Sequence, residues 1–129
     1  MCGTGYFSYP TVELTWGLIL SAARLIPQQV DSVRRGGWQE GLGVSLRGAT
    51  LGILGLGRLG TAVAEIGRAF GMETIAWSEN LTPADAQAKG ATYVSRDKLF
   101  MRSDVLSIHV VLSERTRVFE FSGGAAVTA

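Results

Sequence analysis

The sequence predicts an α/β fold in which helices cover both faces of a parallel sheet, and three observations carry that prediction. Apolar runs of strand length alternate with stretches of helical spacing from residue 49 to residue 112. Such alternation implies right-handed crossovers and therefore parallel strands. Each run is apolar almost throughout, which is typical of a strand covered on both faces. A glycine-rich loop over 55–60 joins the first run directly to the first of these helices.

The N-terminal third precedes this alternating region and is predicted to be helical. Residues 1–9 are expected to form a loop, and Pro10 can open a helix because its fixed φ suits the first turn. Apolar positions of 12–26 cover more than one face of that helix, so we expect a second domain or a subunit to cover part of it. Pro27 should stop or kink the helix. A short helix over 28–35 and an irregular segment over 38–46 follow.

The alternating region gives four strands and three helical segments. The predicted strands cover residues 49–54, 73–77, 91–94 and 105–112. The predicted helical segments cover residues 61–70, 84–89 and 96–100. Gly71 and Gly90 should end the first two, because glycine suits the left-handed cap of a helix. Residues 118–129 break the pattern, since small residues without periodicity are typical of a poorly ordered tail.

Composition narrows the classes of function. The chain has 129 residues, a formal net charge of +1 and 47% hydrophobic residues, which suits one packed domain. So small a net charge gives no electrostatic case for binding nucleic acid or an anionic membrane. The apolar run over 12–26 is shorter than the roughly 20 residues of a membrane-spanning helix. Cys2 is the only cysteine, so we expect neither an intrachain disulfide nor a metal cluster, which fits a cytoplasmic location.

The loop Gly55-Leu56-Gly57-Arg58-Leu59-Gly60 carries the chemistry that spacing can predict. It lies between a predicted strand and a predicted helix, where G-x-G-x-x-G binds the pyrophosphate of a dinucleotide. Gly55 permits the tight turn out of the strand, Gly57 lets the backbone approach the pyrophosphate, and Gly60 lets the helix pack close to the sheet. Free amides around Arg58 and Leu59 then meet the phosphates. The alternative is a tight glycine turn that binds nothing.

The ribose end of such a site usually has an acidic residue about 20 positions further on, at the end of the second strand. Ser78 occupies the natural place for that acid, and Glu79 follows one residue later. Glu79 either turns in to bind the ribose or points to solvent. No arginine or lysine follows closely enough to accept a 2′-phosphate, which favours NAD over NADP. The serine leaves NADP open.

Several motifs in a fixed order make the chain resemble the D-isomer-specific 2-hydroxyacid dehydrogenases from about Thr11 to Arg117. The motifs are Thr11-Val12-Glu13-Leu14, Gly37-Trp38, the run from Leu46 through Gly55 into Gly57-Arg58-Leu59-Gly60, Ser103-Asp104-Val105 and Ser107-Ile108-His109-Val110. This family includes phosphoglycerate, glycerate, formate and D-lactate dehydrogenases and the glyoxylate and hydroxypyruvate reductases. The resemblance implies a Rossmann-type doubly wound parallel sheet, incomplete at about four strands, with an N-terminal interdomain helix.

The resemblance also implies roles for particular residues. Arg58 and Leu59 would contact the cofactor phosphates, Ser78 would face the adenosine ribose, and His109 and Val110 would line the cofactor crevice. In complete enzymes of the family, NAD or NADP exchanges a hydride with a small 2-hydroxy or 2-keto acid. His109 is the only histidine, but the resemblance argues against it as the catalytic acid–base. The family's catalytic arginine, glutamate and histidine lie beyond the matching region, so we expect the isolated chain to be catalytically incomplete.

We therefore expect residues 1–117 to form an NAD(P)-binding domain with a βαβ core over 49–112. A helix over 10–27 would lie between domains or in the interface of a homodimer. The family continues past Arg117 into a helix and a strand, so residues 118–129 are expected to reflect a frameshift, a truncation or a cloning boundary. Two alternatives stay open: a non-catalytic nucleotide-binding or dimerisation module, and a non-functional fragment.

Overall fold

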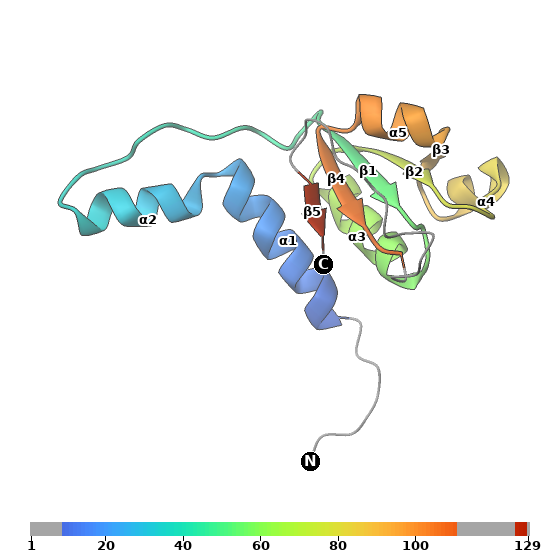
Figure 1. The fold of residues 1–129 in the computed structure, drawn as a ribbon, viewed down its shortest axis with the longest axis horizontal. Coiled ribbons are helices and arrows are strands. Elements are labelled where there is room, and N and C mark those ends of the chain that lie inside the picture. Colours follow the sequence, from blue (N-terminus) through green and yellow to red (C-terminus); the bar gives the residue numbers. More distant parts are fainter. Residues whose placement is uncertain (1–8, 111–125, 129) are drawn as a thin grey trace, which may run out of the picture.

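The centre of the molecule is a parallel five-stranded sheet. The computed structural model describes residues 9–110 and 126–128, and its strands lie in the order β3-β2-β1-β4-β5 (Figure 1). All neighbouring strands pair in parallel. The strands are β1 Thr50–Leu54, β2 Glu73–Trp77, β3 Thr92–Tyr93, β4 Val105–Ile108 and β5 Ala126–Thr128. The predicted α/β fold is confirmed, and the order of the first four strands is that of a Rossmann-type sheet.

The fifth strand differs from the expectation for the C-terminal segment. The sequence predicts a poorly ordered tail over 118–129, whereas β5 pairs with β4 through the register Leu106↔Ala126 to Ile108↔Thr128. A run of three residues is too short to display the periodic pattern by which a strand is recognised in a sequence. The rest of that tail, 118–125 and 129, lies outside the described residues, as do residues 111 and 112 of the last predicted strand.

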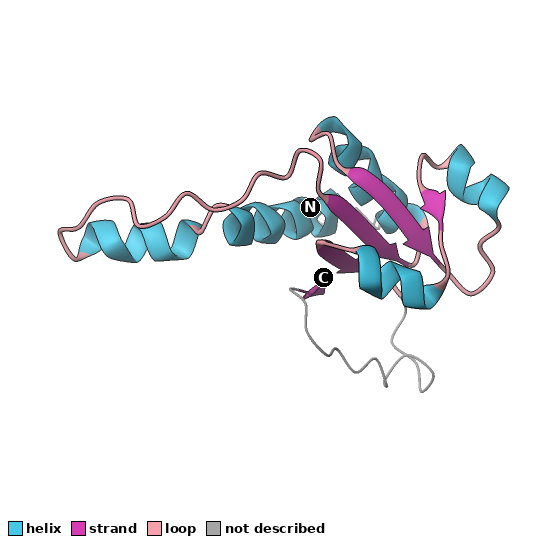
Figure 2. Cartoon of the chain, turned by 90° about the horizontal axis from the view of Figure 1, so that it is seen from above, coloured by secondary structure: helices cyan, strands magenta, loops and turns pink. Residues whose placement is uncertain are grey.

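Helices cover both faces of the sheet. The helices of this region are α3 Arg58–Ala69, α4 Pro83–Ala88 and α5 Arg96–Arg102. Helix α3 packs against β1 and β2 on one face, and α5 packs against the same two strands on the other (Figures 1 and 2). Helix α3 begins inside the glycine loop, three residues before the predicted start at Thr61. It ends at Ala69, and Gly71 follows with the predicted left-handed backbone, at a φ of 78°.

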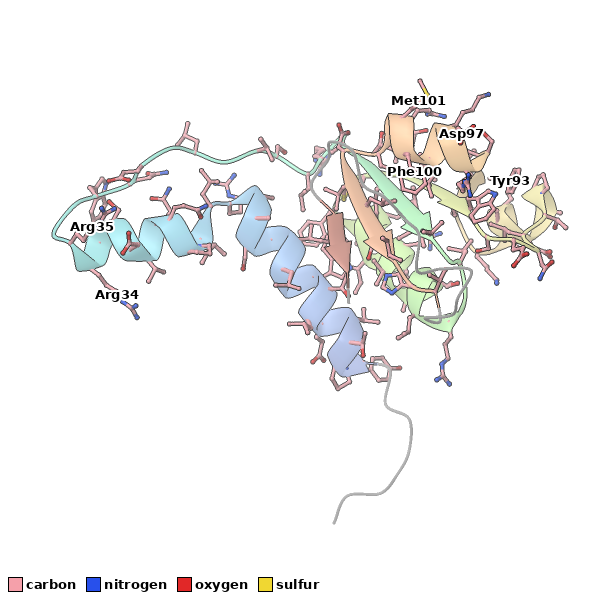
Figure 3. The ribbon with its side chains drawn as sticks, in the orientation of Figure 1. Arg34, Arg35, Tyr93, Asp97, Phe100 and Met101 are labelled. Carbon is pink, nitrogen blue, oxygen red and sulfur yellow. The ribbon has the colours of Figure 1, made fainter. Side chains whose placement is uncertain are left out.

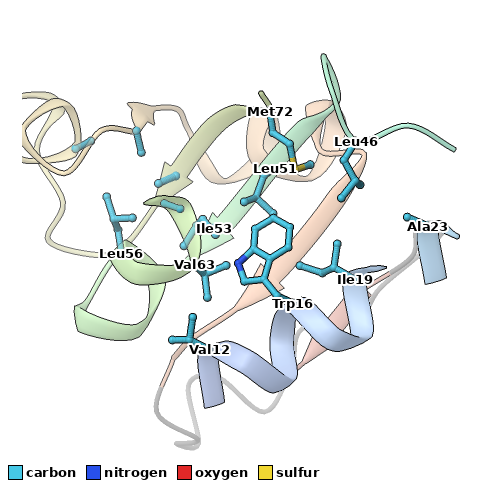
Figure 4. Packing of buried hydrophobic residues seen from close by; sticks show 14 residues of the cluster. Val12, Trp16, Ile19, Ala23, Leu46, Leu51, Ile53, Leu56, Val63 and Met72 are labelled. Atoms are coloured by element: carbon cyan, nitrogen blue, oxygen red, sulfur yellow. The ribbon is translucent and has the colours of Figure 1, made fainter. Parts of the chain in front are cut away.

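The larger core joins the N-terminal helix to the sheet. Trp16 and Ile19 of α1 pack with Leu51 and Ile53 of β1 and with Val63 of α3 (Figure 4). A second cluster lies on the other face, where Leu54, Ile75, Val94, Leu99 and Leu106 pack together. Neighbouring residues of β1 therefore enter different clusters, which explains why this strand is apolar throughout.

Helix α1, Tyr9–Ala23, is buried on one face only. Its buried residues are Val12, Thr15, Trp16, Ile19 and Ala23. Trp16 stacks on Phe70 with ring centroids 4.9 Å apart. Leu14 and Leu18, in contrast, are 58% and 41% exposed. Among the residues that the structure describes, none covers this part of the broad apolar surface predicted for the helix.

Helix α1 ends at Ala23 and the chain bends at Leu25, so the predicted stop or kink at Pro27 comes too late. Leu25 has a left-handed backbone with φ of 56°, and Pro27 lies in the first turn of α2, Ile26–Arg34. Proline is tolerated there because a first-turn N–H has no acceptor within its helix. Residues 24–45, comprising the bend, α2 and the segment that returns along it, are called the arm below. Figure 1 shows the arm extending away from the sheet.

Candidate functional site

The carboxyl ends of three strands meet at one edge of the sheet. Leu54 of β1 is level with Trp77 of β2 and with Ile108 of β4. The backbone pairing continues one step beyond the strands, because Gly55 N donates to Trp77 O at 2.9 Å and His109 N donates to Leu54 O at 2.8 Å. The chain leaves β1 for β2 on one side, while β4 lies on the other side. Such a reversal of strand order is where open α/β sheets bind their ligands.

Gly55 makes the turn out of β1 in a conformation that favours glycine. Its φ is 97°, and a Cβ atom there would lie 2.5 Å from His109 O and 3.0 Å from Val110 Cγ1. The loop therefore rests directly against the segment that follows β4. This contact brings the predicted site residues from two separate motifs to one edge of the sheet.

Gly60 and Gly57 are glycines for different reasons. A Cβ atom on Gly60 would collide with the carbonyl oxygen of Gly55 and lie 2.9 Å from Ile53 Cγ2, so close packing of α3 on β1 requires its absence. Gly57 has φ of −84° and ψ of −157°, which any residue can adopt. A Cβ atom on Gly57 would meet nothing within 4 Å. Neither the backbone nor the packing of the described chain accounts for a glycine at this position.

The N-terminus of α3 presents amides at the same place. Gly57 is its N-cap residue, and the first bond of the helix runs from Thr61 N to Gly57 O at 2.9 Å. The amides of Arg58, Leu59 and Gly60 precede that bond, so they have no acceptor within the helix. Unpaired first-turn amides and the helix dipole together attract an anion such as a phosphate.

Ser78 is tied to the glycine loop. Its Oγ accepts a hydrogen bond of 2.8 Å from Leu56 N, across 22 positions of sequence. Ser78 is half-buried, whereas Glu79 at the next position is exposed. The residue at the usual place of the acid therefore contacts the loop with an uncharged group.

Lys89 is a residue near this site that the sequence analysis missed. It follows the last turn of α4, and its Nζ donates to Leu56 O at 2.9 Å. Both backbone polar groups of Leu56 are therefore bound by side chains, the N–H by Ser78 and the carbonyl by Lys89. The two contacting residues are 33 positions apart, so spacing carried no sign of this contact.

His109 lies where the loop meets the end of β4. Its Nε2 is 2.7 Å from Ser107 Oγ, and its buried Nδ1 has no hydrogen-bond partner among the described residues. Burial lowers the pKa of His109 below its ordinary value of 6.5. The imidazole is therefore neutral at pH 7, so His109 itself would place no positive charge beside a cofactor.

Two further classes of site are absent from residues 9–110 and 126–128. No group of three or more histidine, cysteine, aspartate or glutamate side chains could hold a metal ion there. None of the helices in this part of the chain has the length and apolar character needed to cross a membrane.

The chain is similar to known dehydrogenases over most of its length. The model of the family "D-isomer specific 2-hydroxyacid dehydrogenase, NAD binding domain" matches residues 16–119. A glyoxylate reductase of Aeropyrum pernix is 46% identical over 122 residues, which are 88% of this chain and 36% of that protein. A D-3-phosphoglycerate dehydrogenase of Methanocaldococcus jannaschii is 40% identical over 113 residues, 85% of this chain and 22% of that protein.

Solved structures lead to the same family. The D-lactate dehydrogenase of Aquifex aeolicus, solved with NAD and lactic acid, superimposes with a TM-score of 0.79 at 32% identity. That match covers 87% of this chain and 34% of the other. The chain thus spans about a third or less of the length of the relatives described here. Since the family model covers most of its residues, the chain belongs to the D-isomer specific 2-hydroxyacid dehydrogenase family, in the region of the NAD-binding domain.

Proposed function

We propose that this chain binds NAD through the loop over 55–60, as the cofactor domain of an enzyme that oxidises a D-2-hydroxy acid or reduces the corresponding 2-keto acid. The observation that carries the proposal is the open space beside Gly57. A glycine that neither backbone nor packing requires is explained by a ligand that approaches the backbone closely. The amides at the start of α3, which have no acceptor within the helix, lie next to Gly57 and suit the phosphates of such a ligand.

The neighbouring residues would then divide the binding of the dinucleotide among them. Arg58 and Leu59 would bind the pyrophosphate at the start of α3, and Ser78 would meet the adenosine ribose. His109 and Val110 would line the crevice between β1 and β4. When bound, the nicotinamide supplies the chemistry by accepting or giving up a hydride, while the domain supplies orientation.

We also propose that this chain alone does not turn over a substrate. His109 is its one histidine, and its Nε2 lies 2.7 Å from Ser107 rather than open to a substrate. Burial also favours its neutral form, so little of the protonated imidazole is present to donate a proton to a substrate. Oxidation of NADH by the purified chain with glyoxylate or hydroxypyruvate, above the rate of a Gly57→Val variant, would contradict this proposal.

The test of cofactor binding is the substitution Gly57→Val. Its Cβ enters open space and its backbone is unstrained, so the free energy of unfolding should change by less than about 1 kcal/mol. Its side chain should displace the dinucleotide and weaken NADH binding by at least about tenfold, that is about 1.4 kcal/mol. Quenching of tryptophan fluorescence follows the titration, since Trp77 ends β2 beside the proposed ribose site.

Gly17→Val is the matched control for this titration. Gly17 lies on the exposed face of α1, and a Cβ atom there also meets nothing within 4 Å. This variant should bind NADH as the parent chain does. Equal affinity of the parent and Gly57→Val, or no saturable binding by a folded parent chain, would overturn the proposed function.

A second observation favours assembly into a homodimer. Large apolar side chains are exposed along the outer face of α1 and on the arm, among them Leu14, Val30, Val33 and Trp38. Exposed apolar side chains gathered on one part of a surface mark an interaction site. Helix α2 also carries charges of both signs, on Asp31 and Arg34. We propose a second copy of the chain as the partner, because a helix with both charge signs can pair with itself about a two-fold axis.

The double substitution Leu14→Glu/Val33→Glu tests this assembly. Both side chains are more than half exposed, so the fold should persist while the mass in solution falls to that of a monomer. Met101→Glu is the matched control, because Met101 is 84% exposed on α5, on the other side of the molecule from the arm (Figure 3). Light scattering coupled to gel filtration measures the mass in solution of each variant, and the control should keep the mass of a dimer. A parent chain that is monomeric at high concentration would contradict the proposal.

A further inference from the structure

The contact between Lys89 and Leu56 places a cation beside the proposed ribose site. Lys89 Nζ donates to Leu56 O, and Leu56 N donates to Ser78 Oγ. The ammonium and the hydroxyl therefore flank a single residue of the glycine loop. An ammonium has three N–H donors and the contact with Leu56 uses one, so two remain for another acceptor.

The main chain of Lys89 is fixed independently of this contact. Lys89 N donates to Asp85 O at 3.1 Å, and Lys89 O accepts from Arg68 Nη1 at 3.1 Å. Ala86, in the same turn of α4, is fully buried. Gly90 then turns with φ of 75° beneath the Arg68 side chain. The lysine therefore starts from a rigid position, and only its side chain has to be ordered to reach the loop.

The charge around Ser78 differs from that of a site built to exclude a 2′-phosphate. An aspartate at the end of the second strand holds the ribose hydroxyls and repels a phosphate attached to one of them. Here the hydroxyl of Ser78 accepts from Leu56 and can still donate its own hydrogen. Glu79 does carry a negative charge at the next position, but its exposure lets water and salt screen it.

We propose that Lys89 and Ser78 together form a subsite for a phosphate on the 2′ position of adenosine, so that the chain binds NADP as well as NAD. The proposal rests on the proposed function, because it places the adenosine end of the dinucleotide at Ser78. It revises the preference for NAD over NADP that was predicted from sequence spacing. That spacing placed no basic residue near Ser78, whereas the fold brings Lys89 to the loop.

The substitution Lys89→Met tests the subsite. The variant removes the charge and keeps an unbranched apolar side chain. NADP binding should weaken by about tenfold, the size expected for losing a charge-assisted hydrogen bond, and NAD binding should change by less than twofold. Adenosine 2′,5′-bisphosphate and adenosine 5′-monophosphate, titrated by calorimetry, should repeat the difference without the nicotinamide half. The affinity for NADP should also fall more steeply with added salt than that for NAD.

Lys98→Met is the matched control, because Lys98 is the other lysine and lies exposed on α5, on the opposite face of the sheet from α3. It should leave both affinities unchanged, and Lys89→Arg should retain NADP binding. Equal losses of NAD and NADP in Lys89→Met would show that Lys89 only positions the loop, and would overturn the subsite. Unchanged NADP binding would overturn it too. Both results leave the proposed function standing, whereas a folded parent chain that binds neither dinucleotide overturns both.

Discussion

Large apolar side chains are buried in the sheet and its helices, whereas they are exposed in the arm. In the sheet, Leu51, Ile53 and Ile75 are completely buried. In the arm, Trp38 is 81% and Leu42 is 73% exposed. The first region therefore draws its stability from burying its own apolar side chains. The second exposes large apolar groups to water and must be held in shape by other interactions.

Polar contacts hold the arm in its shape. The side chain of Gln29 donates to Glu40 O at 2.8 Å and accepts from Glu40 N at 3.0 Å. Ser32 Oγ, which is buried, donates to Trp38 O at 2.7 Å. These bonds join α2 to the segment that returns along it. The comparison shows how a surface can be ordered before a partner covers its apolar residues, which lowers the entropy lost on binding.

The largest expected difference between the two regions comes from one substitution made in each of them. Leu51→Ala removes a fully buried side chain from the core and should lower the free energy of unfolding by about 3 kcal/mol. Leu42→Ala makes the same chemical change in the arm and should lower it by less than about 0.5 kcal/mol. Urea titrations at low protein concentration, where any dimer is dissociated, measure both. Similar losses in the two variants would mean that the arm and the sheet share one core.

This contrast also explains which parts of the fold could be predicted from the sequence. The strands β1 and β2 are continuous apolar runs because both of their faces are covered, and such a run is visible in a sequence. The bend at Leu25 was missed because a left-handed leucine has no sequence signal of its own, while Pro27 two residues later does. Residues 126–128 pair with β4 in a strand that is too short to show a periodic pattern in the sequence.

The candidate site divides in the same way. Gly55, Gly57 and Gly60 could be predicted because a nucleotide loop needs glycine for a tight turn, for close approach of the ligand and for close packing of the helix, respectively. Ser78 was found by counting along the second strand. Lys89 could not be found in this way, because its contact with Leu56 depends on how α4 packs beside the loop. A motif predicts the residues that a loop requires for its turn, its packing and its ligand. A contact made by a side chain from a distant turn can be identified only in the folded structure.

A smaller effect is expected when the polar contacts of the arm are removed. Gln29→Ala deletes the hydrogen bonds of its side chain to Glu40, so the exchange of the Glu40 amide with solvent should become about tenfold faster. The free energy of global unfolding should change by less than about 1 kcal/mol, because these groups are exposed. Hydrogen exchange followed by NMR measures the first quantity, and urea titration measures the second.

Gln28→Ala is the matched control for that experiment, since Gln28 precedes Gln29 on α2 and is exposed. It should leave the exchange of the Glu40 amide unchanged. If both glutamine variants exchanged alike, the side-chain bonds of Gln29 would not order the arm. If Gln29→Ala instead lowered global stability by several kcal/mol, the arm would unfold together with the sheet, and the contrast between the two regions would fail.

The smallest effect is a pH dependence confined to the sheet region, at His109. Burial lowers the pKa of His109 in the folded chain below 6.5, so the unfolded chain binds this proton more readily than the folded chain. The contribution of His109 to stability is therefore fully present above about pH 6.5 and is lost as the pH falls from there through the lowered pKa of the folded state. His109→Gln cannot titrate, so its free energy of unfolding should fall less than that of the parent chain between pH 7.5 and pH 5. Because His109 is the only histidine, one imidazole signal in an NMR titration reports the pKa directly, and a midpoint at or above 6.5 would contradict both the burial argument and the neutral state assigned to this residue in the crevice.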